Sequence, residues 1–126
     1  MGSSWKLMAF VAAADLGRAR VFYEGTLGLR VVAEEQFALV LDAHGTMLRV
    51  SKVEHPSIAP YTVLGWIVDD IAAEVDALAA RGIGFERFTI PGFVQDARGI
   101  WTAPDDTRVV WFKDPDGNLL SLTQFP

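Results

Sequence analysis

Residues 22–29 read Phe-Tyr-Glu-Gly-Thr-Leu-Gly-Leu and mark the end of a helix and the start of a strand. Apolar side chains recur at helical spacing from Leu16 to Leu27. Asp15 precedes them and can accept hydrogen bonds from the first N–H groups of the helix. Gly28 follows them and can adopt the left-handed conformation that commonly ends a helix. The sequence therefore predicts one helix between Asp15 and Gly28.

Apolar runs on either side of this helix predict strands. One run precedes the helix and three follow it, with a turn at residues 43–45 between the last two. A loop with two prolines, residues 55–60, leads to a second copy of this order, in which Asp70 begins the helix and Gly82 ends it. We predict strands at residues 6–13, 29–35, 37–42, 46–52, 61–68, 83–90, 100–103, 107–113 and 118–124.

The two halves correspond residue by residue. Asp15 matches Asp70 at an offset of 55 residues, and residues 45–52 match residues 117–124 at an offset of 72. The second half thus carries about seventeen extra residues, many of them in the loop 91–99. Because one βαβββ module alone would expose an apolar sheet face, we expect both to pack together. The prediction is a single α+β domain, residues 1–126, with modules at residues 6–53 and 61–124.

The composition excludes several classes of site and partner. The chain has 126 residues, no cysteine, 51% hydrophobic residues and a formal net charge of −5. Without cysteine there is no thiolate metal site and no thiol nucleophile, and the negative charge disfavours a nucleic-acid partner. No apolar run approaches the ~20 residues that span a bilayer, and no secretory signal is predicted. We therefore expect a cytoplasmic protein without a membrane or nucleic-acid partner.

Two stretches, FYEGTLGL at residues 22–29 and FKDPDGN at residues 112–118, resemble structural motifs of the vicinal oxygen chelate superfamily. That superfamily includes glyoxalases, extradiol dioxygenases, fosfomycin-resistance enzymes and bleomycin-resistance proteins. The resemblance covers residues 6–124. It implies that the two modules form a curved mixed sheet around a cleft, and that a divalent metal lies in this cleft in the enzymes of the superfamily.

The resemblance also implies where the ligands of such a metal would lie in this chain. The four positions are Met8, Arg49, Val63 and Ser121. Val63 has no lone pair, Arg49 is a permanent cation and Met8 is a soft thioether. A catalytic divalent metal needs about three His or carboxylate ligands. We therefore expect no metal and no other cofactor, and we assign no catalytic residue.

Side-chain alternation along the strands predicts which residues share the cleft with these positions. Trp111 is expected to face the cleft because Phe112, by the habit of the superfamily, packs toward the helix. Trp66 points into the core, and Phe93 is either a lid residue or the anchor of its loop. The predicted ligand-binding cleft is lined by Met8, Phe10, Met47, Arg49, Tyr61, Val63, Trp101, Trp111 and Ser121. Plain packing is the alternative to ligand contact for the apolar members of this set.

Arg49 is the one cation predicted in the cleft. A guanidinium in such a place must pair with an acid or meet a ligand. In the first case the partner is Asp42, Glu35 or Asp96. In the second case Arg49 binds a carboxylate, phosphate or phenolate group of a ligand. A third possibility is that the side chain remains solvated at a sheet edge. The net charge of −5 suits a cationic ligand and Arg49 suits an acidic one, so the sequence leaves the charge of the ligand open.

Three functions are compatible with this pattern. The first is a metal-free protein that binds a small-molecule drug or metabolite in an aromatic cleft, as bleomycin-resistance proteins sequester their drug. By the habit of the family, it would be a homodimer with the cleft completed across the interface. The second is a glyoxalase-, lyase- or dioxygenase-like enzyme, which bound metal would favour. The third is a dimerisation or regulatory module whose cleft is packed with its own side chains.

Overall fold

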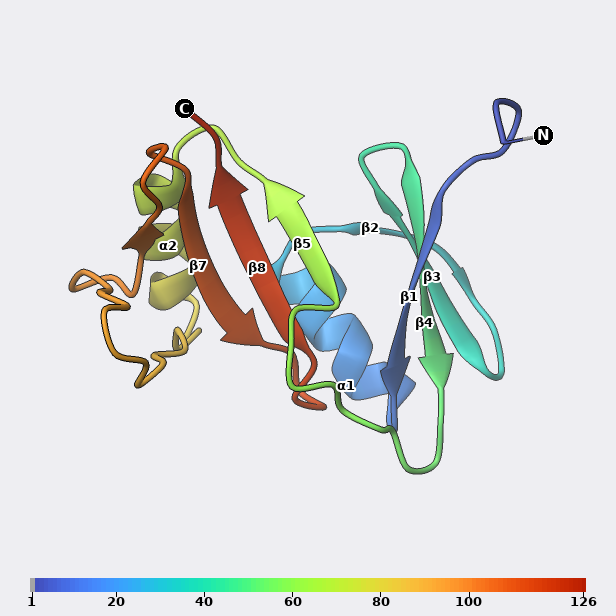
Figure 1. The fold of residues 1–126 in the computed structure, drawn as a ribbon. Coiled ribbons are helices and arrows are strands. Elements are labelled where there is room, and N and C mark those ends of the chain that lie inside the picture. Colours follow the sequence, from blue (N-terminus) through green and yellow to red (C-terminus); the bar gives the residue numbers. More distant parts are fainter. Residues whose placement is uncertain (1) are drawn as a thin grey trace. The chain divides into compact units, whose positions relative to one another are not determined.

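The computed structural model describes residues 2–126, which form two compact units. The first unit ends at Ile58 and the second begins at Ala59, inside the proline-containing loop predicted to separate the modules. Each unit holds one βαβββ module (Figure 1). The α+β class and the two modules are thus confirmed, whereas the packing of both modules into a single domain stays a prediction.

The first unit is a four-stranded mixed sheet with one helical segment. Its elements are β1 (Met8–Ala13), α1 (Leu16–Arg20), η1 (Val21–Thr26), β2 (Arg30–Glu34), β3 (Ala38–Ala43) and β4 (Thr46–Lys52). The strand order is β1-β4-β3-β2, in which β1 runs parallel to β4 and the other neighbours are antiparallel. The α-helix α1 continues directly into the π-helical segment η1.

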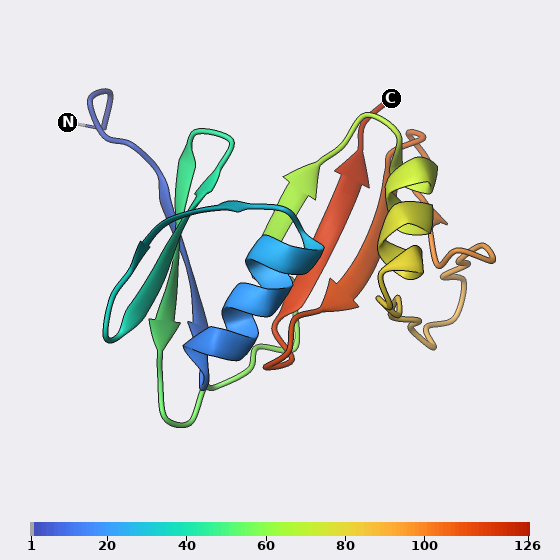
Figure 2. The same cartoon turned by 180° about the vertical axis from the view of Figure 1, so that it is seen from behind.

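The second unit repeats this arrangement. Its elements are β5 (Leu64–Ile67), α2 (Ile71–Ala80), β6 (Trp101–Thr102), β7 (Arg108–Lys113) and β8 (Leu119–Gln124). The strand order is β5-β8-β7-β6, with β5 parallel to β8, and α2 covers one face of this sheet (Figure 2). Phe10 pairs with Arg49 in the first unit, and Gly65 pairs with Ser121 in the second. These pairs differ by the predicted offsets of 55 and 72, so the repeat extends to the strand register.

The ends of both helical segments lie where the sequence predicts them. Asp15 accepts a hydrogen bond from the Arg18 N–H at 3.0 Å, and this N–H lowers the pKa of the Asp15 carboxyl. Gly28 follows with a φ of 76°. Asp70 accepts from the Ala73 N–H at 3.1 Å at the start of the second helix. None of the helices in residues 2–126 is long and apolar enough to cross a membrane.

The prediction of a strand at residues 83–90 is wrong. Within it only Phe85 forms a strand-like bridge, to Phe112. Gly84 weakens strand formation here, and the Phe88 N–H donates to the side-chain Oε1 of Gln95 at 2.9 Å rather than to a neighbouring strand. Elsewhere the strand ends differ from the prediction by up to three residues. Without the extra strand the second half has the same βαβββ order as the first.

One face of each sheet is buried and the opposite face is partly exposed. The buried side chains are Val11, Leu39, Leu41, Leu48 and Val50 in the first unit and Val110, Phe112, Leu120 and Leu122 in the second. They alternate along β1 and β7 with more exposed residues, such as Met8 and Trp111. We call the faces that carry Met8 and Trp111 the outer faces.

The turn between β7 and β8 is held by a buried carboxylate. Asp114 is 6% exposed, and its Oδ1 accepts hydrogen bonds from the backbone N–H groups of Asp116 at 3.0 Å and Asn118 at 2.9 Å. Its Oδ2 accepts a third, from Asn118 Nδ2 at 2.8 Å. Gly117 has a φ of 91°. The FKDPDGN stretch thus forms the predicted hairpin turn.

Candidate ligand-binding site

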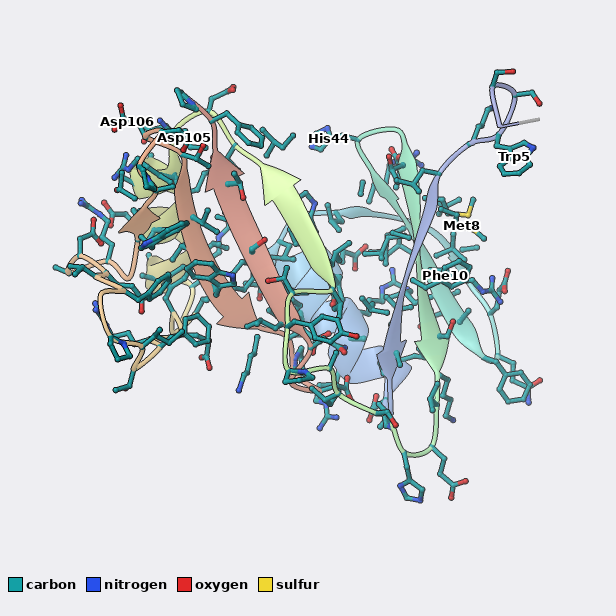
Figure 3. All side chains as sticks on the ribbon, viewed as in Figure 1. Trp5, Met8, Phe10, His44, Asp105 and Asp106 are labelled. Carbon is teal, nitrogen blue, oxygen red and sulfur yellow. The ribbon has the colours of Figure 1, made fainter. Side chains whose placement is uncertain are left out.

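Four of the predicted cleft residues meet on the outer face of the first unit. Met8 pairs in register with Met47, and Phe10 pairs with Arg49. Met8, Phe10 and Met47 are 42%, 55% and 44% exposed. Met8 and Phe10 lie on the same side of β1 (Figure 3). Adjoining exposed apolar side chains make this face a candidate binding surface.

A pocket of about 380 Å³ lies at one end of this outer face. Its apolar walls are Leu7, Met8, Val32 and Met47, the fully buried Leu41 also borders it, and its polar groups come from Lys6, Arg30, Asp42 and Gly45. This size and composition are typical of pockets that hold small organic molecules. Sequence reasoning found only Met8 and Met47. Val32 was missed because the alternation was not followed along residues 29–35, although Val32 lies on the same face of β2 as Arg30.

An ion pair borders the pocket. Arg30 Nη2 lies 3.3 Å from Asp42 Oδ2, and Asp42 Oδ1 accepts a hydrogen bond from the Gly45 N–H at 2.9 Å. The Gly45 N–H, followed by Arg30, lowers the pKa of the Asp42 carboxyl. Asp42 therefore stays ionised at neutral pH, and both of its oxygens already have donors.

Arg49 lies on the same outer face, two residues along β4 from Met47. Its side chain is 34% exposed, and its Nη1 lies 3.2 Å from Glu35 Oε1. In register it stands between Phe10 on β1 and Val40 on β3. Of the three acids that the sequence offered as partners, the structure selects Glu35, which lies just after β2.

The outer face of the second unit carries Ser121 against Gly65. A Cβ on Gly65 would lie 2.6 Å from Ser121 Oγ, so the absence of a side chain there makes room for the serine. Ser121 is only 8% exposed, whereas Val63 is 40% exposed. Tyr61 precedes β5 and is 66% exposed. Of these three predicted cleft residues, Val63 and Tyr61 thus offer accessible surface and Ser121 offers little.

Four half-exposed aromatic rings gather beside this face, and we call them the aromatic cluster: Phe88, Phe93, Trp101 and Trp111. Phe93 stacks on Trp101 with ring centroids 5.2 Å apart and an interplanar angle of 22°. Phe93 also lies 5.7 Å from Trp111, and Phe88 meets Trp111 edge to face at 5.3 Å. The two predicted tryptophans are therefore brought together, and the loop 91–99 adds Phe93 to them.

Gln95 fixes the segment that supplies Phe88 and Phe93. Its Nε2 donates to the carbonyls of Glu86 at 3.0 Å and Gly99 at 2.8 Å, while its Oε1 accepts from the Phe88 N–H. Sequence reasoning missed Phe88, which it placed in a strand, and it missed Gln95. An amide that bonds backbone groups several residues away leaves no periodic pattern to detect.

The residues at the four ligand positions of the superfamily do not fit a divalent metal. On the first unit the two positions hold the thioether of Met8 and the ion-paired guanidinium of Arg49. On the second they hold the aliphatic Val63 and the hydroxyl of Ser121, which are poor ligands for a hard cation. Within the described chain, no three His, Asp or Glu side chains come close enough together to hold a metal ion. The side chains at these positions therefore do not support metal-dependent chemistry.

The sequence matches the family model of the Glyoxalase/Bleomycin resistance protein/Dioxygenase superfamily over residues 7–122. The chain therefore belongs to this superfamily, in agreement with the motifs at residues 22–29 and 112–118. No functionally curated protein matches the sequence.

Solved structures of the same fold come from several bacteria. A superfamily member from Sphaerobacter thermophilus DSM 20745 is 22% identical, with a TM-score of 0.76 over 98% of this chain and 99% of that one. A lactoylglutathione lyase from Agrobacterium tumefaciens is 20% identical, with a TM-score of 0.72 over 98% and 96%. TnmS3, an antibiotic-binding protein from Streptomyces sp. CB03234, is 23% identical, with a TM-score of 0.72 over 100% and 99%.

These similarities establish the fold and leave the activity open. One of the three structures is an enzyme by its name and another is a binding protein. The choice between the two classes therefore depends on the side chains of this chain.

Proposed function

We propose that the protein binds a small organic molecule without a metal and does not transform it. The pocket on the outer face of the first unit carries this proposal. It has a volume of about 380 Å³, and Met8, Val32 and Met47 are among its walls. Its two best-placed charges, Arg30 and Asp42, already pair with each other. Apolar walls with a few fixed polar groups suit binding. The lowered pKa of Asp42 makes its carboxylate a weak general base, and a guanidinium such as that of Arg30 does not give up its proton.

The aromatic cluster of the second unit favours a ligand with a planar ring. Trp101 and Trp111 keep part of their indole surface exposed, and Gln95 holds the segment that bears Phe88 in place. Offset stacking and edge contacts with such rings contribute about 0.5–1.5 kcal/mol beyond simple burial. A fixed, partly exposed set of rings is therefore suited to an aromatic drug or metabolite.

The alternative function is a glyoxalase-, lyase- or dioxygenase-like enzyme. The fold is compatible with both functions, since a lactoylglutathione lyase and an antibiotic-binding protein have similar structures. The enzyme would need metal ligands outside the four expected positions, because Met8, Val63 and Arg49 cannot supply them. Because the four expected positions lack suitable metal ligands, we favour the binding function over the enzyme.

The proposal extends to the assembly and location of the protein. We propose a homodimer, because exposed apolar side chains on the outer face of the second unit, such as Ile67 at 75%, would be costly to leave in water. We propose the cytoplasm as its location, because a chain without cysteine is suited to a reducing compartment. Sedimentation equilibrium at micromolar concentration gives the mass of the assembly directly.

A titration with a planar aromatic probe tests the binding function. We expect naphthalene-2-carboxylate or its carboxamide to bind with a micromolar dissociation constant in isothermal calorimetry. Met8→Ala should weaken this binding roughly three- to tenfold, because it removes an apolar wall of the pocket on the first unit. Phe125→Leu removes a 57% exposed aromatic ring outside the pocket and should leave the constant unchanged. Equal losses in both variants would speak against a role for the pocket.

A further inference from the structure

The guanidinium of Arg49 has unused hydrogen-bonding capacity on an apolar surface. An arginine side chain carries five N–H donors in a fixed planar fork. Arg49 uses Nη1 for its contact with Glu35 at 3.2 Å, and its Nε and Nη2 have no partner among residues 2–126. The side chain is 34% exposed, so these donors are only partly hydrated. The Nε–Nη2 edge of a guanidinium is matched in geometry to the two oxygens of a carboxylate.

The Nε–Nη2 edge of Arg49 lies near the pocket of the first unit. Met47, a wall of the pocket, and Arg49 are two residues apart on β4 and face the same side. Side chains in this relation are separated by roughly 7 Å along a strand. Phe10 adjoins Arg49 in register and is 55% exposed, so an apolar surface continues from the pocket to the guanidinium. A ligand with an apolar body and an acid group at one end matches this arrangement.

We propose that the ligand is an organic acid whose apolar body occupies the pocket and whose carboxylate pairs with the Nε–Nη2 edge of Arg49. The inference rests on the proposed binding function and adds the chemical class of the ligand. Asp42 does not offer an equivalent place for a cation, because Gly45 and Arg30 already donate to its two oxygens. Glu35 weakens the attraction of Arg49 for an anion, because it already supplies one negative charge at 3.2 Å.

Two variants with opposite expected effects test this assignment. The probes are naphthalene-2-carboxylate and the neutral naphthalene-2-carboxamide, each titrated by calorimetry at low ionic strength. The natural protein should bind the acid about tenfold more tightly than the amide, because charge-assisted hydrogen bonds are the stronger kind. Arg49→Gln should remove this preference. Glu35→Gln should strengthen binding of the acid by up to about fivefold, the range of an exposed ion pair, and leave the amide unchanged.

Arg108→Gln provides the matched control. It removes the same charge from a half-exposed arginine of the second unit and should keep the preference for the acid. Equal binding of acid and amide by the natural protein would overturn the assignment of Arg49 and leave the binding function standing. Failure of both probes to bind would overturn the binding function, and the assignment with it. A preference for the acid that survives Arg49→Gln would also overturn the assignment.

Discussion

Asp114→Ala should lower the free energy of unfolding by about 3 kcal/mol and the melting temperature by roughly 10 °C. Asp114 is 6% exposed, and its carboxylate accepts hydrogen bonds from the backbone N–H groups of Asp116 and Asn118 and from Asn118 Nδ2. The substitution takes the acceptor from these donors while the turn stays buried, and Asn118 itself is 6% exposed. Urea and thermal unfolding followed by circular dichroism measure the loss.

Asp105→Ala is the matched control for this prediction. Asp105 also lies in a hairpin turn of the second unit, but it is exposed and its Oδ1 accepts one backbone hydrogen bond, from Thr107 at 3.0 Å. Water can replace that acceptor, so the loss should stay below about 1 kcal/mol. If both variants lost the same stability, the burial of Asp114 would not be the cause.

Met47→Glu should weaken binding of the neutral probe naphthalene-2-carboxamide by roughly 30- to 150-fold, which corresponds to about 2–3 kcal/mol. Met47 is a wall of the pocket, and Asp42 stands opposite it in register. The new carboxylate would face the ionised Asp42, whose arginine partner is already engaged, and it would replace an apolar wall that the neutral ring contacts with a charge that the ring would have to desolvate. Calorimetry measures the affinity, and a thermal melt shows whether the variant remains folded.

Val21→Glu adds the same charge at a position outside the pocket. Val21 is 72% exposed on η1 and should tolerate the change with no effect on binding. If Met47→Glu bound the probe as tightly as Val21→Glu does, the pocket would not be the binding site.

Much of the fold follows from local patterns in the sequence. Asp15 and Asp70 accept hydrogen bonds at the starts of the helices, and Gly28 has the positive φ predicted for it. The offsets of 55 and 72 between the two halves recur in the register of β1 with β4 and of β5 with β8. These features depend on short-range chemistry and on alternation, which a sequence displays directly.

The features that sequence analysis missed depend on contacts between distant residues. The segment 83–90 contains strand-forming residues, yet the Phe88 N–H bonds to the side chain of Gln95. Val32 joins the pocket because the pairing of β2 with β3 brings Arg30 and Val32 beside Asp42 and Met47. The choice of Glu35 as the partner of Arg49 depends on the turn between β2 and β3. Such choices follow from tertiary geometry, which overrides local propensity.

The proposed function depends on the binding of an organic ligand without a metal. The most direct test is a calorimetric titration with naphthalene-2-carboxylate in two states of the protein. One sample of the protein is dialysed against EDTA. The other is dialysed in the same way and then receives one equivalent of Zn²⁺ or Ni²⁺. The expected result is the same micromolar dissociation constant, within twofold, in both states. Binding that appears only after the metal is added would contradict it and would assign the protein to the metal-dependent members of its superfamily.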